Sequence, residues 1–230
     1  MINEKLIEYY QNCECVEKDR LSRDRCNNIE YTTTMYLLNK YLPKSGSVLD
    51  CCAGGGIYAF SLANQGYEVT AGDLVKKHVD ILNSENKNGL LKSVYQGDVL
   101  DMSRFSNESF DVVLCMGALY HLMELNDRKK CVEGCLRVLK KGGLFVAAYI
   151  NRNAVYINHF NQNPPVERRK HIFETITNAG VDGLRYPLAY RINTAENDDF
   201  ENYMEYHLSS CEEPSIIGHS MHGLYIGRKL

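Results

Sequence analysis

A glycine-rich turn is the part of the sequence whose residue types point most clearly to chemistry. The apolar segment Val48–Asp50 ends in a carboxylate, and the chain then passes through Cys52, Ala53, Gly54 and Gly56 into a segment with helical periodicity. Glycine permits positive φ and lets the backbone approach a ligand closely, while the start of a helix offers free N–H groups. A tight loop needed only for packing is the alternative. We expect this turn to bind a nucleotide-like ligand.

Asp50 narrows the kind of ligand that the turn can accept. Its carboxylate would repel a pyrophosphate, whereas it would attract a cationic amino group or a sulfonium. Two further acidic residues follow later strands of the predicted sheet, since Asp73 ends the second strand and Asp98 follows the third. A carboxylate in the position of Asp73 reaches the hydroxyl groups of a ribose. The acidic residues therefore favour a nucleoside ligand that carries no pyrophosphate.

These motifs together resemble those of the class I S-adenosylmethionine-dependent methyltransferases, in the branch of bacterial small-molecule enzymes. VLDCCAGGG, which contains Asp50, is similar to the first motif of that family. Asp73 in VTAGDL matches the residue that holds the ribose there, and Asp98 in QGDVLDM matches the one that meets the adenine amino group. FDVVLCMGALYHL and CLRVLKKGGLFVAAYI are similar to the fourth strand, the next helix and the fifth strand. The resemblance covers roughly residues 28–150, and Cys52 departs from it because the family usually has glycine there.

The resemblance implies both a reaction and a cofactor. It implies that a methyl group passes from S-adenosylmethionine to an O, N or S atom of a small molecule by in-line displacement. Such a reaction depends on positioning and on exclusion of water, and no metal is expected. The residues expected to bind the cofactor are Asp50, Cys52, Ala53, Gly54, Gly56, Asp73, Leu74, Asp98, Val99, Met116, Tyr10 and Arg20.

Two residues that follow the fourth strand are the candidate catalytic groups, Tyr120 and His121. A histidine titrates near neutral pH, so His121 is suited to take a proton from a hydroxyl or ammonium acceptor. The alternative for each of the two is a packing or hydrogen-bonding role that shapes the pocket.

The N-terminal 40 residues are predicted to be helical and, by the resemblance, to form a lid over the site. Tyr10 and Arg20 are candidate partners for the carboxylate of the cofactor or of an acidic substrate, because phenol and guanidinium groups bind carboxylates. Amphipathic helices that merely cover the edge of the sheet are the alternative for this segment.

The cysteines indicate a reducing compartment. They number nine, without a CxxC pair: Cys13, Cys15, Cys26, Cys51, Cys52, Cys115, Cys131, Cys135 and Cys211. An odd number of unevenly spaced cysteines, with no export signal, is typical of free thiols in the cytoplasm. The three N-terminal thiols leave open a site for a soft ion such as arsenite. The side chains of Cys51 and Cys52, as neighbours, are expected to diverge, and Cys131 and Cys135 are expected to lie in a helical core.

Apolar segments alternate with helical ones from residue 46 to residue 150, which predicts a Rossmann-like, doubly wound α/β fold. The expected strands of this part are Ser47–Asp50, Tyr67–Ala71, Lys92–Gln96, Phe110–Met116 and Leu144–Ile150. We expect a seven-stranded sheet whose last strand is antiparallel. The expected C-terminal elements are a helix at 166–179, a strand at 181–192, a helix at 197–210 and a strand at 221–228.

The expected organisation is one methyltransferase domain over residues 1–230. It divides into the lid at 1–40, a cofactor-binding half at 46–150 and a part at 151–230 with a substrate-side insertion and the C-terminal strands. A length of 230 residues suits one domain with a sizeable core.

Charge and composition favour a small-molecule acceptor. The net charge of −3, from 26 basic and 29 acidic residues, gives no general attraction to nucleic acid, and no apolar stretch is long enough to span a membrane. A tRNA or protein methyltransferase and an arsenite or thiol methyltransferase remain alternatives. An NAD-linked oxidoreductase and a non-catalytic cofactor-binding protein are further alternatives, and the oligomeric state stays open.

Overall fold

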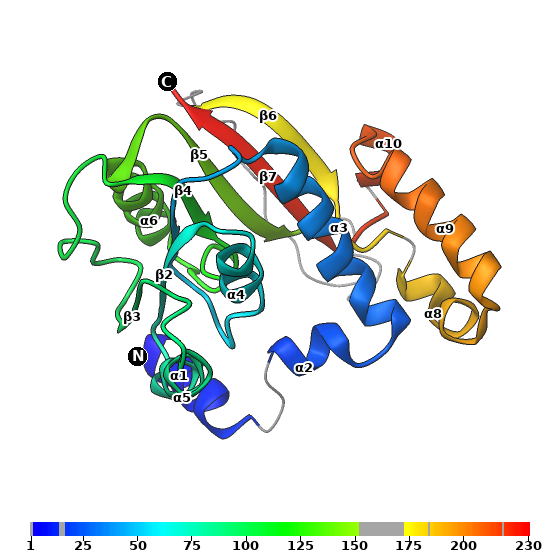
Figure 1. Cartoon of the computed structure of the whole chain (residues 1–230), viewed down its shortest axis with the longest axis horizontal. Helices are drawn as coiled ribbons and strands as arrows, with labels where there is room; N and C mark the ends of the chain where they lie inside the picture. The colour runs from blue at the N-terminus through cyan, green and yellow to red at the C-terminus, as the bar shows by residue number, and fades with distance from the viewer. Residues whose placement is uncertain (1, 14–16, 152–172, 184, 218) are drawn as a thin grey trace.

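The computed structural model describes residues 2–13, 17–151, 173–183, 185–217 and 219–230 (Figure 1). Its centre is a seven-stranded sheet with the strand order β3-β2-β1-β4-β5-β7-β6. The strands are β1 (Ser47–Asp50), β2 (Glu68–Asp73), β3 (Ser93–Gln96), β4 (Phe110–Cys115), β5 (Leu139–Ile150), β6 (Phe173–Gly180) and β7 (His222–Lys229). The pairs among β1 to β5 are parallel, whereas β7 runs antiparallel to both β5 and β6. The predicted doubly wound, seven-stranded fold with an antiparallel last strand is confirmed.

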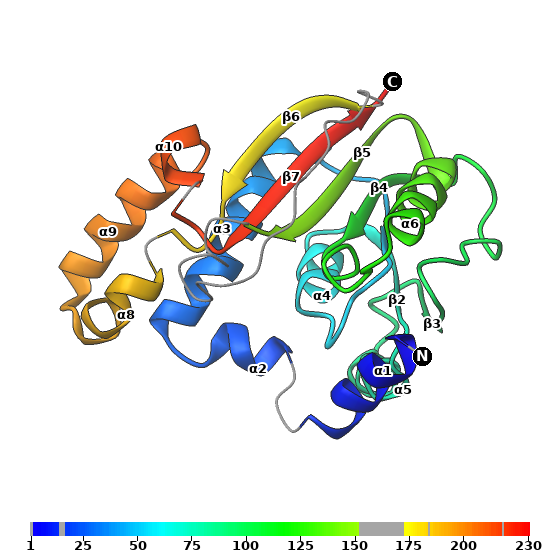
Figure 2. The ribbon, with the colours of Figure 1, turned by 180° about the vertical axis from the view of Figure 1, so that it is seen from behind.

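Helices cover both faces of the sheet (Figures 1 and 2). Those described are α1 (Ile2–Asn12), α2 (Glu17–Ser22), α3 (Arg25–Tyr41), α4 (Ile57–Asn64), α5 (Lys76–Glu85), α6 (Leu125–Val138), α8 (Arg185–Thr194), α9 (Asn197–Ser210) and α10 (Pro214–Ile217). None of these helices is long and apolar enough to cross a membrane.

The side chains of β4 point alternately to the two faces of the sheet. Val112 and Leu114 pack with residues of α3 and α4 in one apolar cluster. Val113 and Cys115 point the other way and pack with residues of α6 in a second cluster. Because β4 is buried on both faces, it reads in the sequence as an unbroken apolar run, as a central parallel strand should.

The topology places a binding site at the carboxyl end of β1. This strand pairs with β2 on one side and with β4 on the other, so the order of the strands reverses there. The loops after neighbouring strands lead to opposite faces at such a point and leave a crevice between them. The glycine turn, Asp73 and the segment after β4 all lie beside this crevice.

Two expectations for the C-terminal part were wrong. Residues 173–180 form β6 where the end of a helix was expected, and residues 185–194 form α8 where a strand was expected. The β-branched Thr175, Ile176 and Thr177 suit a strand, and the partner of β6 is β7, which lies too far along the chain for a local pattern to show it. In α8, Leu188 and Ile192 are four apart and pack in one cluster with Ile29 of α3, which requires a helix.

Other expectations for this part are confirmed or lie beyond the described residues. The expected helix at 197–210 is α9, and the expected strand at 221–228 is β7. The expected insertion at 151–165 falls, from residue 152, outside the residues that the structure describes, as does the start of the expected helix at 166–179.

The helical N-terminal segment is divided between two locations. Helix α3 packs on the sheet through buried residues such as Leu37 and Leu38 and is part of the core. Helix α1 lies against α5, and the two helices overlap in both views (Figures 1 and 2). This position brings α1 to the carboxyl ends of β1 and β2.

Candidate active site

The glycine turn has a backbone that other residues would strain. Gly54 and Gly56 have φ values of 53° and 82°, in the left-handed region, and Gly56 is the N-cap of α4. A Cβ atom on Gly56 would lie 2.5 Å from Cδ2 of the buried Leu82. The turn is fixed to β2 by a hydrogen bond of 2.9 Å that the Ala53 N–H donates to the carbonyl oxygen of Gly72. The glycines therefore allow the chain to turn tightly between β1 and α4.

Asp50 is an unusual carboxylate because it is buried and only partly paired. The residue is 1% exposed, and its Oδ1 atom has no hydrogen-bond partner among the described residues. Burial raises the pKa of Asp50 to about 7, despite a hydrogen bond from the backbone of Cys52. A buried acceptor without a donor is costly, so the site suits a ligand that brings a cationic donor to this oxygen.

Asp73 holds the glycine turn and the start of α5. Its Oδ2 atom accepts a hydrogen bond of 2.8 Å from the Gly54 N–H, and Oδ1 accepts one of 2.8 Å from the Val75 N–H. The Nδ1 atom of His78 lies 3.1 Å from Oδ1, in a pair that is almost fully buried. No sequence motif predicted a role for His78. Its position in the first turn of α5, the helix that follows β2, brings it to this edge of the sheet.

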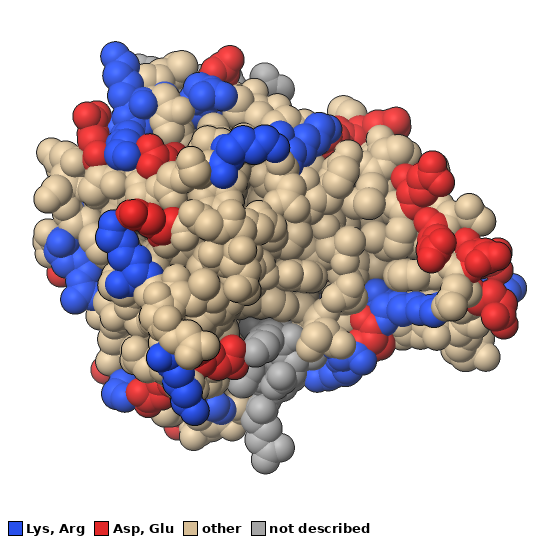
Figure 3. Space-filling view, viewed as in Figure 1, with Lys and Arg blue, Asp and Glu red and all other residues tan. Residues whose placement is uncertain are grey.

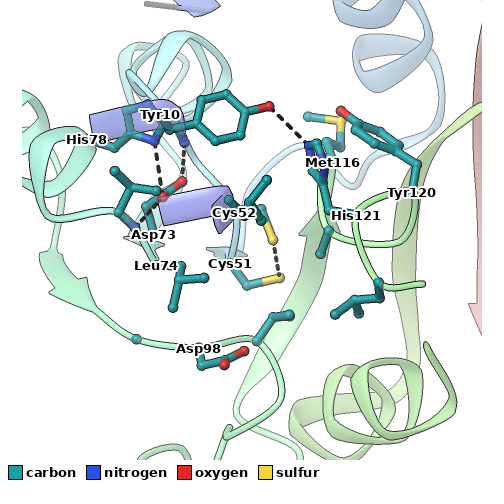
Figure 4. Close-up of a pocket in the computed structure, with 18 residues that line it drawn as sticks. Tyr10, Cys51, Cys52, Asp73, Leu74, His78, Asp98, Met116, Tyr120 and His121 are labelled. Carbon is teal, nitrogen blue, oxygen red and sulfur yellow. Dashed lines mark hydrogen bonds and ion pairs between the residues drawn. The ribbon is translucent and has the colours of Figure 1, made fainter. Parts of the chain in front are cut away.

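A first pocket lies between these residues and the segment that follows β4 (Figure 4). Its lining includes Leu6, Tyr10, Cys51, Cys52, Gly54, Asp73, Leu74, His78, Asp98, Val99, Met116, Tyr120 and His121. The Oδ1 atom of Asp98 accepts a hydrogen bond of 2.9 Å from the Leu100 N–H, which fixes the loop after β3. The pocket is thus bounded by the loops after β1, β2, β3 and β4.

Helix α1 closes one side of the first pocket through Tyr10 (Figure 4). The hydroxyl oxygen of Tyr10 lies 3.1 Å from Nε2 of His121, and the two rings meet edge-on with centroids 5.7 Å apart. Tyr10 also meets the ring of His78 edge-on, at 5.6 Å. Burial lowers the pKa of His121. The neutral imidazole is therefore favoured, and its contact with Tyr10 joins the loop after β4 to α1.

A second pocket lies on the other side of the glycine turn. It shares Cys52, Gly54, Met116 and Tyr120 with the first pocket, so these residues separate the two cavities. Its other lining residues include Glu30, Thr34, Asp50, Ala53, Tyr58, Ala148, Val181, His222 and Leu224. The carboxylate of Asp50 therefore belongs to the wall of the second pocket.

Glu30 and His222 line the second pocket, and the buried Asp182 is paired with His222. Nδ1 of His222 lies 2.8 Å from Oδ2 of the fully buried Asp182 and 3.6 Å from Oε2 of Glu30. Burial lowers the pKa of His222, but the hydrogen bond to Asp182 and the nearby carboxylate charges outweigh it, so the pKa is raised overall. Asp182 also accepts from the backbone N–H groups of Met221 and His222. Such a pair fixes the orientation of the imidazole ring.

The structure brings most of the expected cofactor-binding residues together. Those that line the first pocket are Tyr10, Cys52, Gly54, Asp73, Leu74, Asp98, Val99 and Met116. Asp50 and Ala53 line the second pocket, and Gly56 shapes the turn as the cap of α4. Arg20 lines neither pocket, and its guanidinium donates to both carboxylate oxygens of Glu30 at 2.9 and 3.0 Å.

Sequence reasoning missed the group formed by Glu30, Asp182 and His222. The three residues come from α3, the segment after β6 and the first position of β7. No short motif contains them, because only the pairing of β7 with β5 and β6 brings them together. The expected divergence of Cys51 and Cys52 was also wrong, since their Sγ atoms are 3.9 Å apart (Figure 4). The chain turns directly after β1, so the alternation of a strand no longer applies.

The relatives of the chain point to one family. Residues 49–147 match a family model described as a methyltransferase domain. The ubiquinone biosynthesis O-methyltransferase of Coxiella burnetii is 28% identical over 118 residues, which are 51% of this chain and 49% of that protein. The protein of the same name from Xylella fastidiosa is 32% identical over 117 residues, 50% of this chain and 46% of that one. The chain spans about half the length of the curated relatives it matches.

Solved structures share the fold at low sequence identity. A methyltransferase from Haloferax volcanii, in complex with the activator Trm112, superposes with a TM-score of 0.63 at 17% identity, over 98% of this chain and 97% of that one. The PH0226 protein of Pyrococcus horikoshii superposes with a TM-score of 0.58 at 17% identity, over 97% and 99% of the two chains. These structures support the fold, and the family model supports the resemblance of the motifs. Residues 49–147 are therefore similar to a methyltransferase domain, in agreement with the resemblance of the motifs to the class I S-adenosylmethionine-dependent methyltransferases.

Proposed function

We propose that this chain transfers a methyl group from S-adenosylmethionine to an O, N or S atom of a small molecule. The observation that carries the proposal is the buried Oδ1 atom of Asp50, which has no hydrogen-bond partner among the described residues. A cationic ammonium group is the ligand feature that such an atom favours, and S-adenosylmethionine carries one. A dinucleotide would bring a pyrophosphate to the same turn, where Asp50 and Asp73 are both acidic.

The residues present fit the parts of this cofactor. Asp50 would hold its amino group, Asp73 its ribose, and Asp98 with Val99 its adenine, while Tyr10 covers it from α1. Asp73 can accept further hydrogen bonds, because each carboxylate oxygen has two lone pairs. S-adenosylmethionine supplies a methyl group that is already activated on a sulfonium. The task of the chain is therefore to align the acceptor and to exclude water.

The second pocket is the proposed acceptor site. Met116 and Tyr120 line both pockets, so an acceptor beside His222 in the second pocket would face the amino-acid end of a cofactor that reaches from the first pocket to Asp50. His222 lies in the wall of the second pocket, and Asp182 holds its ring in place. For a hydroxyl or ammonium acceptor, a neutral His222 is suited to take the proton. His121 and Tyr120 remain candidates, and the contact of His121 with Tyr10 favours a role in closing the lid.

The surface charge favours a small acceptor. Figure 3 shows acidic side chains gathered over the end of the molecule formed by α8 and α9, with Lys and Arg scattered over the rest of this face. The exposed acidic residues of that end are Glu196, Asp198, Asp199, Glu201 and Glu205. A tRNA substrate requires a broad basic surface, which this face does not provide. The free cysteines are also consistent with the proposed cytoplasmic compartment.

Cofactor binding to the whole chain tests the proposal. Isothermal titration with S-adenosylmethionine, S-adenosylhomocysteine and NAD should show binding of the first two alone. Asp50→Asn should weaken that binding by about 100-fold, because an amide does not offer the charge that the ammonium group needs. Asp80→Asn, at an exposed position of α5, is the matched control and should bind as the natural chain does. Tight binding of NAD would overturn the proposal.

A panel of acceptors separates the remaining alternatives. Turnover with phenols, amines or thiols is the expected result, and preferential methylation of tRNA, of a protein or of arsenite would overturn the assignment to small organic acceptors. Cofactor binding without turnover on any acceptor would favour a non-catalytic binding protein.

A further inference from the structure

Five cysteines from three parts of the chain meet beneath the glycine turn. Cys51 and Cys52 follow β1, Cys115 ends β4, and Cys131 and Cys135 lie one turn apart on α6. We call these five residues the thiol cluster. Four of them, all except Cys52, are almost fully buried in the apolar layer between the sheet and α6.

The sulfur atoms of the thiol cluster lie within ligand distance of one another. The Sγ atoms of Cys51, Cys115 and Cys135 all lie within 4.8 Å of each other. Cys131 extends this triad, with its Sγ atom 3.7 Å from that of Cys115, and Cys52 extends it at 3.9 Å from Cys51. An ion about 2.3 Å from each of several thiolates holds those sulfurs about 3.8 Å apart. Small side-chain shifts would therefore bring the triad onto one ion.

The thiol cluster borders the first pocket. Cys51 and Cys52 both line that pocket, and the other thiols lie behind them. The same two residues continue directly from Asp50 into the glycine turn. A group bound to the thiol cluster would therefore pull on the turn that the cofactor requires.

The apolar surroundings limit the charge of the bound species. Cys115 and Cys135 are fully buried, and apolar side chains such as Val113 and Val138 surround them. A complex with net charge would be costly in this layer. Three thiolates around a divalent ion leave one negative charge, whereas three thiolates around a trivalent ion leave none. The chemistry of the site thus favours a trivalent, thiophilic centre with three sulfur ligands.

We infer that Cys51, Cys115 and Cys135 form a binding site for trivalent arsenic or antimony, and that its occupation weakens cofactor binding. Arsenous acid condenses with the three thiols, so that three As–O bonds break and three As–S bonds form. The thiol protons leave with the hydroxyl groups as three molecules of water, and no atom changes its oxidation state. This site is distinct from the N-terminal thiols, and it goes beyond the proposed methyl transfer because the arsenic is held as a ligand and not as a methyl acceptor.

Arsenite binding to the reduced full-length chain tests the inference. Native mass spectrometry should show one arsenic per chain, and X-ray absorption at the arsenic edge should show three sulfur ligands. Cys135→Ala and, separately, Cys115→Ala should weaken binding by about 100-fold, because each removes one arm of a chelate. Circular dichroism should first show that each variant is folded, and whichever variant folds provides the test. Cys211→Ala, at a buried cysteine away from the thiol cluster, should bind arsenite normally.

Two further measurements distinguish the possible results. Arsenite should weaken the binding of S-adenosylhomocysteine by about tenfold, and S-adenosylhomocysteine should weaken arsenite binding equally, because coupling is reciprocal. Zn²⁺ should bind the thiol cluster less tightly than arsenite does. Tighter binding of Zn²⁺, or arsenite binding that disappears in Cys13→Ala or Cys26→Ala and persists in Cys135→Ala, would overturn the inference. Failure of methyl transfer would leave these binding results unaffected.

Discussion

The two pockets differ in how far apart in the sequence the residues that line them are. The first is built mainly from residues of the loops after β1 to β4, each of which directly follows its strand. The second takes Glu30 from α3, Val181 from the segment after β6 and His222 from β7. Consecutive β–α units bring the first group together through local rules alone, whereas the second group depends on long-range strand pairing. Most residues of the first pocket can therefore be recognised from short motifs, whereas Glu30, Val181 and His222 of the second pocket cannot.

The largest expected effect concerns the glycine turn, which lies beside the first pocket. Gly56→Ala should lower the free energy of unfolding by about 3 kcal/mol, because a side chain at positive φ is strained and its Cβ would overlap Leu82. Chemical denaturation measures this loss. Gly66→Ala is the control, since Gly66 also has positive φ, at 94°, but no atom lies within 4 Å of its Cβ position. Equal losses in the two variants would show that the overlap with Leu82 has no effect.

The next prediction distinguishes the role of His222 from that of His121. His222→Asn should lower kcat by about 100-fold for a hydroxyl acceptor and leave the Kd of the cofactor unchanged, because a general base contributes at this scale. His121→Asn should mainly weaken cofactor binding, since His121 contacts Tyr10 of α1. Steady-state kinetics and titration of both variants make the comparison.

The pH dependence of turnover gives a second check on His222. Its raised pKa means that the imidazole is protonated at low pH, so activity should rise with pH as the ring loses its proton. At saturating cofactor, this rise in kcat should disappear in the residual activity of His222→Asn and persist in His121→Asn. The opposite pattern would make His121 the base.

The smallest expected effect concerns the lid. Tyr10→Phe removes the hydroxyl group that contacts Nε2 of His121 and keeps the ring that packs against His78. We expect cofactor affinity to fall about fivefold, the scale of one hydrogen bond. Tyr9→Phe, at an exposed neighbouring position, should have no effect. Unchanged affinity in Tyr10→Phe would mean that α1 does not close over the cofactor.

Much of the fold was predictable because neighbouring elements follow one another along β1 to β5. Alternating apolar and helical segments predicted the parallel part of the sheet, and the glycine turn marked its switch point. β6 and α8 were missed because β6 takes its identity from pairing with β7, and α8 takes its helical form from packing against Ile29. Local sequence is compatible with both elements but does not by itself determine either one.

In the candidate site too, only residues that directly follow a strand could be placed from the sequence. Asp73 and Asp98 follow their strands directly, so their positions were predictable from spacing. Arg20 was expected at the cofactor, but its guanidinium is held by Glu30, a contact that no spacing rule reveals. The roles of these residues toward the cofactor stay predictions.

The central claim is that Asp50 receives the cationic amino group of S-adenosylmethionine, and proton release on binding tests it most directly. With a pKa near 7 in the free protein, Asp50 is largely protonated at about pH 6, and a bound ammonium group would favour its ionised form. Affinity should therefore rise with pH up to about 7 and then level off. Calorimetry at about pH 6 in buffers of different ionisation enthalpy should show close to one proton released per S-adenosylhomocysteine bound, and none in Asp50→Asn. Binding without proton release in the natural chain, or equal release in Asp50→Asn, would contradict the claim.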